Sequence, residues 1–430
     1  MRVVSLFTVL VVAGFVAGTA GAQPAFDANR DLIARLAAAV RAPCAYPGDT
    51  FRQMAGRLGP DVGLIHQQGL RDRAEPIGWQ RSFALKPYGM IEVTRLVPPD
   101  ARGHISAELQ LAAGDRLLPV LSVLAGLDCA VIEARRLVYD RRGQLDRMIV
   151  LDAELEPTGA SSPLNPPVPA ATAPDPGGVR IAVLDTGVNY RLPPIAAALA
   201  RDSNGRALGY DFWDLDPYPF DSDTRRSAFY PMHQGTRTAS VIVAEAPRAR
   251  IVPYRFPFPD LGLMADLVRD ADTAGARIVV ISYAAAAEGD WDAFIEAAEA
   301  RPNLLIIAAA GPGGRNLDVT AEPPATLALP NVIVVTAADK RGRLLGNANY
   351  GPRSVHLAVA AEDVAVIDFS GQRGLGSGTG IAAARLAAYA ARLLAANPDW
   401  TMTRLREGLL KAGRPPVGEP ARTRHGVMVD

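Results

Sequence analysis

The sequence predicts an α/β protein in which a parallel sheet carries helices on both faces and follows a smaller α+β domain. Five short apolar runs alternate with helical patterns in the C-terminal half, and this alternation is typical of parallel sheets. Upstream of residue 157, apolar and polar residues instead alternate at every second position, which is typical of antiparallel strands. The five apolar runs are Ile181–Leu184, Ile251–Tyr254, Ile278–Ser282, Leu304–Ala310 and Val332–Thr336.

The composition is that of a globular protein with enough apolar residues for a large core. The 430 residues are 49% hydrophobic and 21% charged, and this length indicates two or three domains. The formal net charge is +0, which argues against nucleic acid or an anionic membrane surface as a partner.

Residues 1–22 have the three parts of a secretory signal peptide. Met1-Arg2 is followed by an apolar run from Val3 to Ala17 and by the small residues Ala20-Gly-Ala22. The run is too short to span a bilayer comfortably, and the rest of the sequence has no apolar run of about 18 residues. We therefore expect an exported protein, periplasmic or secreted, without membrane insertion.

Residues 23–156 are expected to form the α+β domain. The spacing of apolar residues predicts a helix from Asp27 to Val40, and strict alternation predicts a strand over residues 105–111. Leu137–Tyr139 and Met148–Leu151 flank a glycine-containing turn and predict a hairpin.

The chain has two cysteines, Cys44 and Cys129, and both lie in the N-terminal domain. An oxidising compartment allows them to pair, so we expect one disulfide. By chain-entropy reasoning such a bridge stabilises the fold by about 4 kcal/mol.

Residues 157–178 are rich in proline and small residues. Such a stretch cannot bury much apolar area, so we expect an extended, semi-rigid linker. Residues 179–430 then form the second domain, which two long helical patterns close at Ile381–Ala396 and Thr401–Lys411.

One strand of the second domain ends at a carboxylate. Ile181–Leu184 is followed by Asp185-Thr-Gly187, and side chains at the carboxyl ends of parallel strands commonly face ligands. This stretch resembles the aspartate motif of the subtilisin-like serine peptidases, the subtilases. Three later stretches match that family's pattern in order: His233–Ser240, Ala308–Gly314 and Ser377–Ala384. The resemblance runs from about residue 178 to the C-terminus and implies a subtilisin-like fold.

The resemblance assigns the catalytic aspartate to Asp185, but the base position differs. Acyl transfer in this family uses a serine nucleophile, a histidine base and an aspartate that orients the histidine. Gln234 stands at the family's histidine position, and an amide cannot take up and return a proton. The adjacent His233 is a weak alternative base, because one step along a helix rotates a side chain by about 100°.

The other two reacting positions are also substituted. Gly380 follows Gly378-Thr379 where the family has its nucleophilic serine, and glycine has no side chain to form an acyl-enzyme. Pro312 stands at the position of the oxyanion-donating asparagine and has neither a side-chain amide nor a backbone N–H. The nearby hydroxyls of Ser377 and Thr379 are expected to point elsewhere.

These substitutions predict a pseudopeptidase that acts by binding a peptide or protein partner. The alternative is a serine endopeptidase that uses a displaced His233 and an unidentified hydroxyl. Without a histidine beside it, Asp185 needs other hydrogen-bond donors, and we expect Gln234, Arg237 or the amides of the Gly187 loop. Bulky Tyr283, in the family's substrate-pairing segment, is expected to obstruct a peptide strand.

No cofactor is expected. The glycine-rich stretch Gly374–Gly380 precedes a helix but lacks the lysine of a phosphate-binding loop. Calcium is an alternative, since subtilases often bind it and an acidic run offers oxygen ligands, although prolines interrupt any known loop spacing. That run comprises Asp214, Asp216, Asp221 and Asp223.

Overall fold

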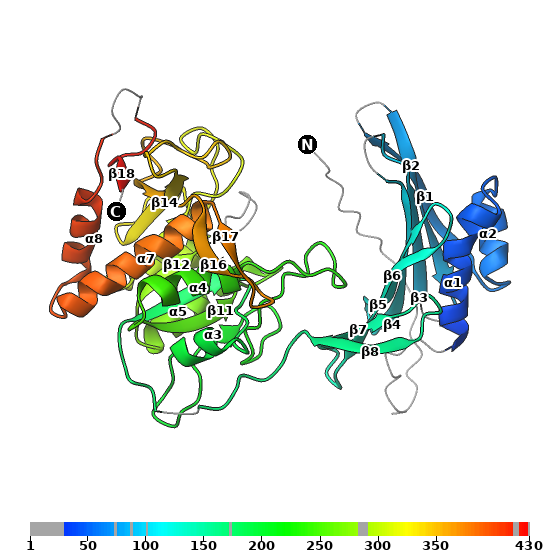
Figure 1. Ribbon diagram of the computed structural model, residues 1–430, viewed down its shortest axis with the longest axis horizontal. Helices are drawn as coiled ribbons and strands as arrows, with labels where there is room; N and C mark the ends of the chain where they lie inside the picture. Colours follow the sequence, from blue (N-terminus) through cyan, green and yellow to red (C-terminus); the bar gives the residue numbers. More distant parts are fainter. Residues whose placement is uncertain are drawn as a thin grey trace.

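The chain forms two units, each built around its own eight-stranded sheet (Figure 1). The computed structural model describes residues 30–72, 75–86, 89–99, 102–171, 174–282, 291–415 and 421–428. The predicted signal peptide, residues 1–22, lies outside these ranges.

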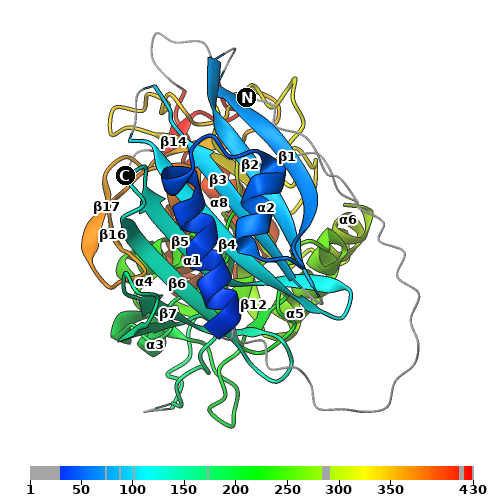
Figure 2. The same cartoon turned by 90° about the vertical axis from the view of Figure 1, so that its right-hand side faces the viewer.

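The first unit consists of two helices and an antiparallel sheet whose strands follow one another in chain order. Helices α1 (Arg30–Ala45) and α2 (Phe51–Leu58) lie over one face of this sheet (Figure 2). The strands are β1 (Gly63–Asp72), β2 (Glu75–Leu85), β3 (Gly89–Leu96), β4 (His104–Ala113), β5 (Arg116–Gly126), β6 (Val131–Tyr139), β7 (Leu145–Leu151) and β8 (Pro157–Pro163).

The two-residue alternation in β4 explains how the sheet acquires its core. Ile105, Ala107 and Leu109 are fully buried in the cluster that includes the apolar stripe of α1 and α2. The intervening residues of β4 are half-buried and polar. The predicted helix, strand and β6–β7 hairpin are all present, and the predicted Cys44–Cys129 disulfide joins the end of α1 to the turn between β5 and β6.

The structure differs from the sequence expectation at the start of the predicted linker. Pro157–Pro163 is strand β8, which pairs with β7 at the edge of the sheet. Proline lacks an N–H but is tolerated on edge strands and at strand ends, where both prolines of β8 lie. Composition alone therefore concealed the last strand of the first unit.

The second unit contains a parallel sheet in the order β10-β11-β9-β12-β13-β14-β15-β18. The five predicted strands are confirmed to within a few residues at each end. They are β9 (Arg180–Asp185), β11 (Arg250–Arg255), β12 (Ala276–Ile281), β13 (Leu305–Ala309) and β14 (Val332–Ala338). The sheet also contains β10 (Tyr210–Asp211), β15 (Leu357–Ala360) and β18 (Val427–Met428), and β16 (Val364–Ile367) and β17 (Arg373–Gly376) form a separate hairpin.

Helices cover both faces of this sheet, as predicted. Alternate residues of each buried strand belong to two separate apolar clusters, one on each face. One cluster includes α3 (Pro193–Ala198), α4 (Gly235–Glu245), α7 (Thr379–Ala396) and α8 (Met402–Lys411), and the other includes α5 (Met264–Thr273) and α6 (Asp292–Glu299).

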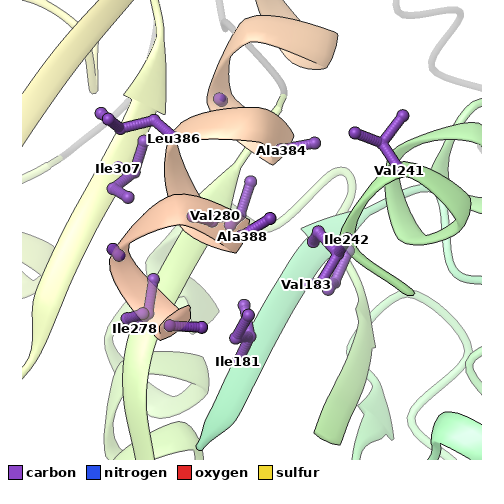
Figure 3. Close-up of a cluster of buried hydrophobic side chains, with 14 of the residues drawn as sticks. Ile181, Val183, Val241, Ile242, Ile278, Val280, Ile307, Ala384, Leu386 and Ala388 are labelled. Atoms are coloured by element: carbon purple, nitrogen blue, oxygen red, sulfur yellow. The ribbon is translucent and has the colours of Figure 1, made fainter. Parts of the chain in front are cut away.

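Helix α7 crosses the centre of the sheet and uses alanine to approach it closely. Figure 3 shows Ala384 and Ala388 beside Val280 of β12, with α4 contributing Val241 and Ile242 to the same cluster. Neither α7 nor any other helix in the described ranges is both long and apolar enough to cross a membrane.

The two units contact each other through a segment that lies between β10 and α4. Phe229 is fully buried against Leu137, Met148 and Leu164 of the first unit. The Arg135 guanidinium donates to the Phe229 carbonyl at 2.6 Å and lies 4.2 Å from the centre of the Tyr230 ring. This same segment continues directly to the start of α4, where the family's histidine position lies.

Candidate functional site

The strand order reverses at β9, which identifies the end of the sheet where ligands are expected. Strand β9 lies between β11 and β12. The chain continues from β9 to β10 and β11 on one side of it, and then crosses to β12 and the later strands on the other side. In open α/β sheets such a switch point forms a crevice at the carboxyl ends of the strands. Asp185 is the last residue of β9, and Ser282 directly follows β12.

The Asp185 carboxylate is buried and accepts hydrogen bonds from three neighbours. The Thr186 amide donates to Oδ1 at 2.7 Å, and the Thr238 hydroxyl donates to Oδ2 at 2.7 Å. The Ser282 hydroxyl also donates to Oδ2. Asp185 is 1% exposed, so these donors replace water almost completely.

One of the three expected kinds of donor is present, because the Thr186 amide belongs to the loop that contains Gly187 and donates to Oδ1. The two expected side chains were wrong. Gln234 donates instead to the Ser282 carbonyl at 3.3 Å, Arg237 is exposed, and neither bonds to the Asp185 carboxylate. The reason is geometric, because Thr238 lies one turn further into α4 on the inward side and Ser282 lies at the end of the strand adjacent to β9.

A second buried carboxylate, Asp221, lies beside Asp185. Thr186 joins the two, because its amide donates to Asp185 and its hydroxyl donates to Asp221 at 2.6 Å. Asp221 is fully buried. Its carboxylate also accepts hydrogen bonds from the backbone N–H of Thr236 at 2.9 Å and from the backbone N–H of Gln234 at 3.2 Å. Both amides belong to the start of α4, so Asp221 fixes the position of that helix.

Burial raises the pKa of both carboxyl groups to about 6, although the hydrogen bonds to each lower it. The negative charge of Asp221 raises the pKa of Asp185 further. Among the described residues no cation pairs with either group. The site therefore holds two desolvated acids supported by hydroxyls and amides rather than by an imidazolium.

Gln234 and Gly380, which the motifs assign to the family's base and nucleophile positions, are adjacent in space. A Cβ built on Gly380 would lie 3.5 Å from the Gln234 side-chain nitrogen and 3.3 Å from the Ser282 Cβ. Gln234 precedes α4 and Gly380 is the second residue of α7. The fold thus brings the two substituted positions together. Gln234 contributes a side-chain amide, and Gly380 contributes only its backbone methylene.

A close backbone approach fixes the position of Gln234. A Cβ at Gly235 would lie 1.9 Å from the Gly187 carbonyl oxygen and 3.0 Å from the Asp185 Cβ. Only glycine fits between them, so the start of α4 lies directly against the loop after β9.

His233 is directed toward a different neighbour. Its Nδ1 lies 2.6 Å from the Asp221 carbonyl oxygen, and its ring stacks on Phe369 with centroids 3.6 Å apart and planes 6° from parallel. Burial lowers the pKa of this imidazole, which favours its neutral form. His233 directly precedes Gln234 in the sequence, but its ring stacks on Phe369 and does not occupy the place of the Gln234 side chain.

The loop that carries Pro312 offers no substitute for the missing oxyanion donor. Pro312 is exposed after β13, and the next two amides, of Gly313 and Gly314, donate to the Asn347 carbonyl at 2.6 and 3.1 Å. These amides are therefore already paired, so they cannot replace the family's asparagine as free donors.

Two hydroxyl residues near Gly380 have their own surroundings. The Ser377 hydroxyl accepts from the Asp363 amide at 2.9 Å, and Thr379 is buried at the start of α7. The suggested obstruction by Tyr283 falls outside the described residues.

The acidic run considered for calcium is divided among different partners. Asp214 pairs with Arg255 at 2.5 Å, Asp216 accepts from Asn165 at 2.6 Å, and Asp223 pairs with Arg225 at 2.5 Å. Within the described ranges no group of three or more histidine, cysteine or acidic side chains is arranged to hold a metal ion.

Sequence reasoning missed the hydroxyl residues of the site. Thr238 lies four residues after Gln234, a spacing that places both on one side of a helix. Ser282 ends the strand adjacent to β9, and the carboxyl ends of parallel neighbours lie together. The spacing of Thr238 and the position of Ser282 could have indicated the site if the strand order had been known. The sequences of the individual strands do not give that order.

The fold and the site define a parallel α/β protein with a buried aspartate, Asp185, at the carboxyl end of a central strand. The family model of the peptidase S8 proteins, described as the subtilase family, matches residues 177–425. The chain therefore belongs to the subtilase family. A comparison with curated proteins gave no significant match.

Several solved structures are similar to this chain. A structure reported for the assembly of subtilase cytotoxin SubAB is 21% identical with a TM-score of 0.51, over 59% of this chain and 88% of that one. A lanthipeptide protease is 20% identical with a TM-score of 0.48, over 58% and 86%. The A-subunit of the AB5 toxin from E. coli is 20% identical with a TM-score of 0.48, over 59% and 90%.

Proposed function

We propose that this chain is an exported pseudopeptidase, a subtilase-fold protein that binds a peptide or protein partner without cleaving it. The observation that carries the proposal is the contact between positions 234 and 380. A Cβ at Gly380 would lie 3.5 Å from the Gln234 side-chain nitrogen, and this proximity supports the assignment of the family's nucleophile and base positions to a glycine and a glutamine. Nucleophilic catalysis requires a hydroxyl or thiol beside a base, and neither is present at these positions.

The surroundings of Asp185 support the same proposal. Its carboxylate accepts hydrogen bonds from the Thr238 and Ser282 hydroxyls, so it has hydrogen-bond donors without an imidazole. The paired amides of Gly313 and Gly314 give no free donors for a developing oxyanion. A fold that keeps its core and loses these groups retains the ability to bind.

The first experiment tests for hydrolysis. Purified protein is treated with a fluorophosphonate probe and assayed with casein and fluorogenic peptides, beside Asp185→Ala and His233→Ala. We expect no labelling and no hydrolysis by any of the three proteins. Labelling and hydrolysis by the unmodified chain that disappear in Asp185→Ala or His233→Ala would identify an endopeptidase with a rearranged triad and overturn the proposal.

A restored variant tests the geometry independently. Gln234→His, Gly380→Ser and Pro312→Asn together place the family's groups at the three substituted positions. Fluorophosphonate labelling of the variant at residue 380 would show that the position is accessible and correctly oriented. We expect slow labelling, because Ser282 and Thr238 compete with the new imidazole for Asp185 and the Cβ at 380 lies only 3.3 Å from Ser282.

A binding experiment completes the test. Protein coupled to beads captures partners from a periplasmic extract, in parallel with Gly380→Tyr, whose ring fills the space between α4 and α7. A partner of the site is retained by the unmodified chain and lost with the variant. Equal capture by both would place the interaction elsewhere and count against the site.

A further inference from the structure

The second unit has a large cavity at the end of the sheet opposite Asp185. The cavity is lined by the first residues of β9, β11 and β12 and by the C-terminal ends of α4 and α7. In Figure 1 the C-terminal end of α7 lies on the side of the second unit away from the first. The volume of about 1110 Å³ exceeds the roughly 300–1,000 Å³ of typical small-molecule sites.

The lining of this cavity, here called the arginine cavity, is strongly cationic although the whole chain has no net charge. Among the described residues, the lining contains five arginines and no acidic residue, and the arginines come from four different elements or their flanking loops. They are Arg180, Arg248, Arg250, Arg277 and Arg392.

A nearby carboxylate neutralises only part of this charge. Asp175 lies 3.9 Å from both Arg180 and Arg250. Arg277 donates to the Trp400 carbonyl at 3.2 Å and Arg392 donates to the Glu245 carbonyl at 2.7 Å. Carbonyl groups accept hydrogen bonds but carry no net charge. Among the described residues, no carboxylate therefore balances the positive charges of Arg277 and Arg392.

Arg248 has no role in holding the fold together. It is exposed, and its side chain forms no hydrogen bond or ion pair with the part of the chain that the structure describes. An arginine of this kind at the rim of a cavity is available to a ligand, and guanidinium groups pair well with carboxylates.

The floor of the arginine cavity is aliphatic. Ala246, Ala249, Ala391 and Leu394 contribute to it and are between 2 and 6% exposed. No aromatic side chain occurs in the described lining. The cavity therefore combines an apolar base with a cationic rim.

We propose that the arginine cavity binds an acidic peptide segment of a partner protein. Its carboxylates would pair with Arg248, Arg277 and Arg392, while aliphatic side chains between them lie on the alanine and leucine floor. This inference concerns the opposite end of the sheet from the proposed peptidase-like site and does not rest on the function proposed there.

The chemistry of the lining favours a peptide over other anions. Single-stranded nucleic acid is bound with aromatic side chains on which bases stack, and the lining has none. A fatty acid carries one carboxylate, which would leave most of the cationic rim without a counter-charge. An acidic peptide with spaced carboxylates and aliphatic residues matches both the number of arginines and the apolar floor.

The experiment measures binding of a fluorescein-labelled peptide of alternating glutamate and leucine to the full chain by fluorescence anisotropy. Arg248→Glu and Arg277→Glu test the rim. Arg341→Glu is the matched control, because Arg341 is also exposed, lies outside the cavity and forms no side-chain bond with described residues. Circular dichroism confirms that each variant is folded.

We expect each rim variant to bind at least about tenfold more weakly, the control to bind normally, and affinity to fall with salt because the contacts are charged. A lysine–leucine peptide should not bind. Absence of binding, or the same loss with Arg341→Glu, overturns the proposal. Equal binding of a glutamate–serine peptide or of a DNA oligonucleotide also overturns it, because either result shows attraction by charge without the aliphatic floor.

Discussion

Asp185, which the sequence motif assigns to the family's aspartate position, accepts hydrogen bonds from hydroxyls and an amide. The Thr238 and Ser282 hydroxyls can donate to a carboxylate and can also accept from a protonated carboxyl group. An imidazolium would stabilise only the charged form. The present site therefore tolerates both protonation states of Asp185, and burial shifts the balance toward the neutral one.

The raised pKa of Asp185 predicts how stability depends on pH. Because burial raises the pKa to about 6 from an unfolded value of about 3.9, the folded state binds the proton more tightly. The free energy of unfolding therefore falls as pH rises from about 4 to about 6. Asp185→Asn removes the charge and keeps the shape, so at pH 7 it should be more stable than the unmodified chain by roughly 1 to 3 kcal/mol.

Urea unfolding at pH 4.5 and pH 7 measures this effect. The pH dependence should be smaller in Asp185→Asn but not absent, because Asp221 has a pKa raised in the same direction. An unchanged pH dependence in the variant would mean that Asp185 stays charged in the folded state across this range.

At the residue scale, the motifs in the sequence assign the family positions but do not indicate their contacts. Gln234 and Gly380 follow from motif spacing, and their proximity in the fold agrees with that spacing. The donors to Asp185 depend on which strand lies beside β9 and how closely α4 approaches it. Such packing depends on the strand order and on Gly235, so the motif did not reveal Ser282 or Thr238.

At the scale of elements, the disulfide holds α1 against the first sheet. Cys44 and Cys129 are 85 residues apart, so the bridge closes a long loop. Replacing both by serine should lower the free energy of unfolding by about 4 kcal/mol, because the unfolded chain gains entropy. Urea unfolding measures this loss, and reductant should destabilise the unmodified chain but leave the double variant unaffected. Equal sensitivity of the two proteins would contradict the assignment.

The contact of Phe229 with the first unit predicts a second effect at this scale. Phe229→Ala removes a fully buried ring packed against Leu137, Met148 and Leu164, a change that costs about 3–5 kcal/mol in a core. The two units should separate more readily, and an added protease should cut the chain after Leu164 faster. Leu215→Ala is the control, because Leu215 is in the same segment and 60% exposed. Equal cleavage of both variants would show that Phe229 does not hold the units together.

The elements themselves were largely predictable from the sequence. The strands of the parallel sheet are continuous apolar runs, which burial on both faces requires. Strand β8 was not recognised, because Pro157–Pro163 has the composition of a linker and gains its structure from pairing with β7. The contact of Phe229 was equally hidden, since the aromatic residues between β10 and α4 are spaced without a helical or strand period.

At the scale of the whole molecule, the two ends of one sheet have different properties. The carboxyl end holds buried acids beside Gln234 and Gly380, and the amino end holds the arginine cavity. Strand β9 starts at the cavity and ends at Asp185, so the two sites share a strand that is buried from Ile181 to Asp185. The first unit is attached through Phe229 to the segment that leads into α4, next to the family's histidine position.

This arrangement predicts that the first unit stays attached to the second. Many subtilases remove the segment ahead of the peptidase domain by cutting themselves, and residues 23–156 occupy that place in this chain. A chain without a nucleophile at position 380 cannot make that cut, so the exported protein should have the mass of Gln23–Asp430. Intact mass spectrometry after prolonged incubation measures this directly. A fragment beginning near residue 178 that is absent from Asp185→Ala would indicate self-cleavage and contradict the pseudopeptidase proposal. The same fragment in both proteins would indicate another protease acting on the exposed residues between the two units.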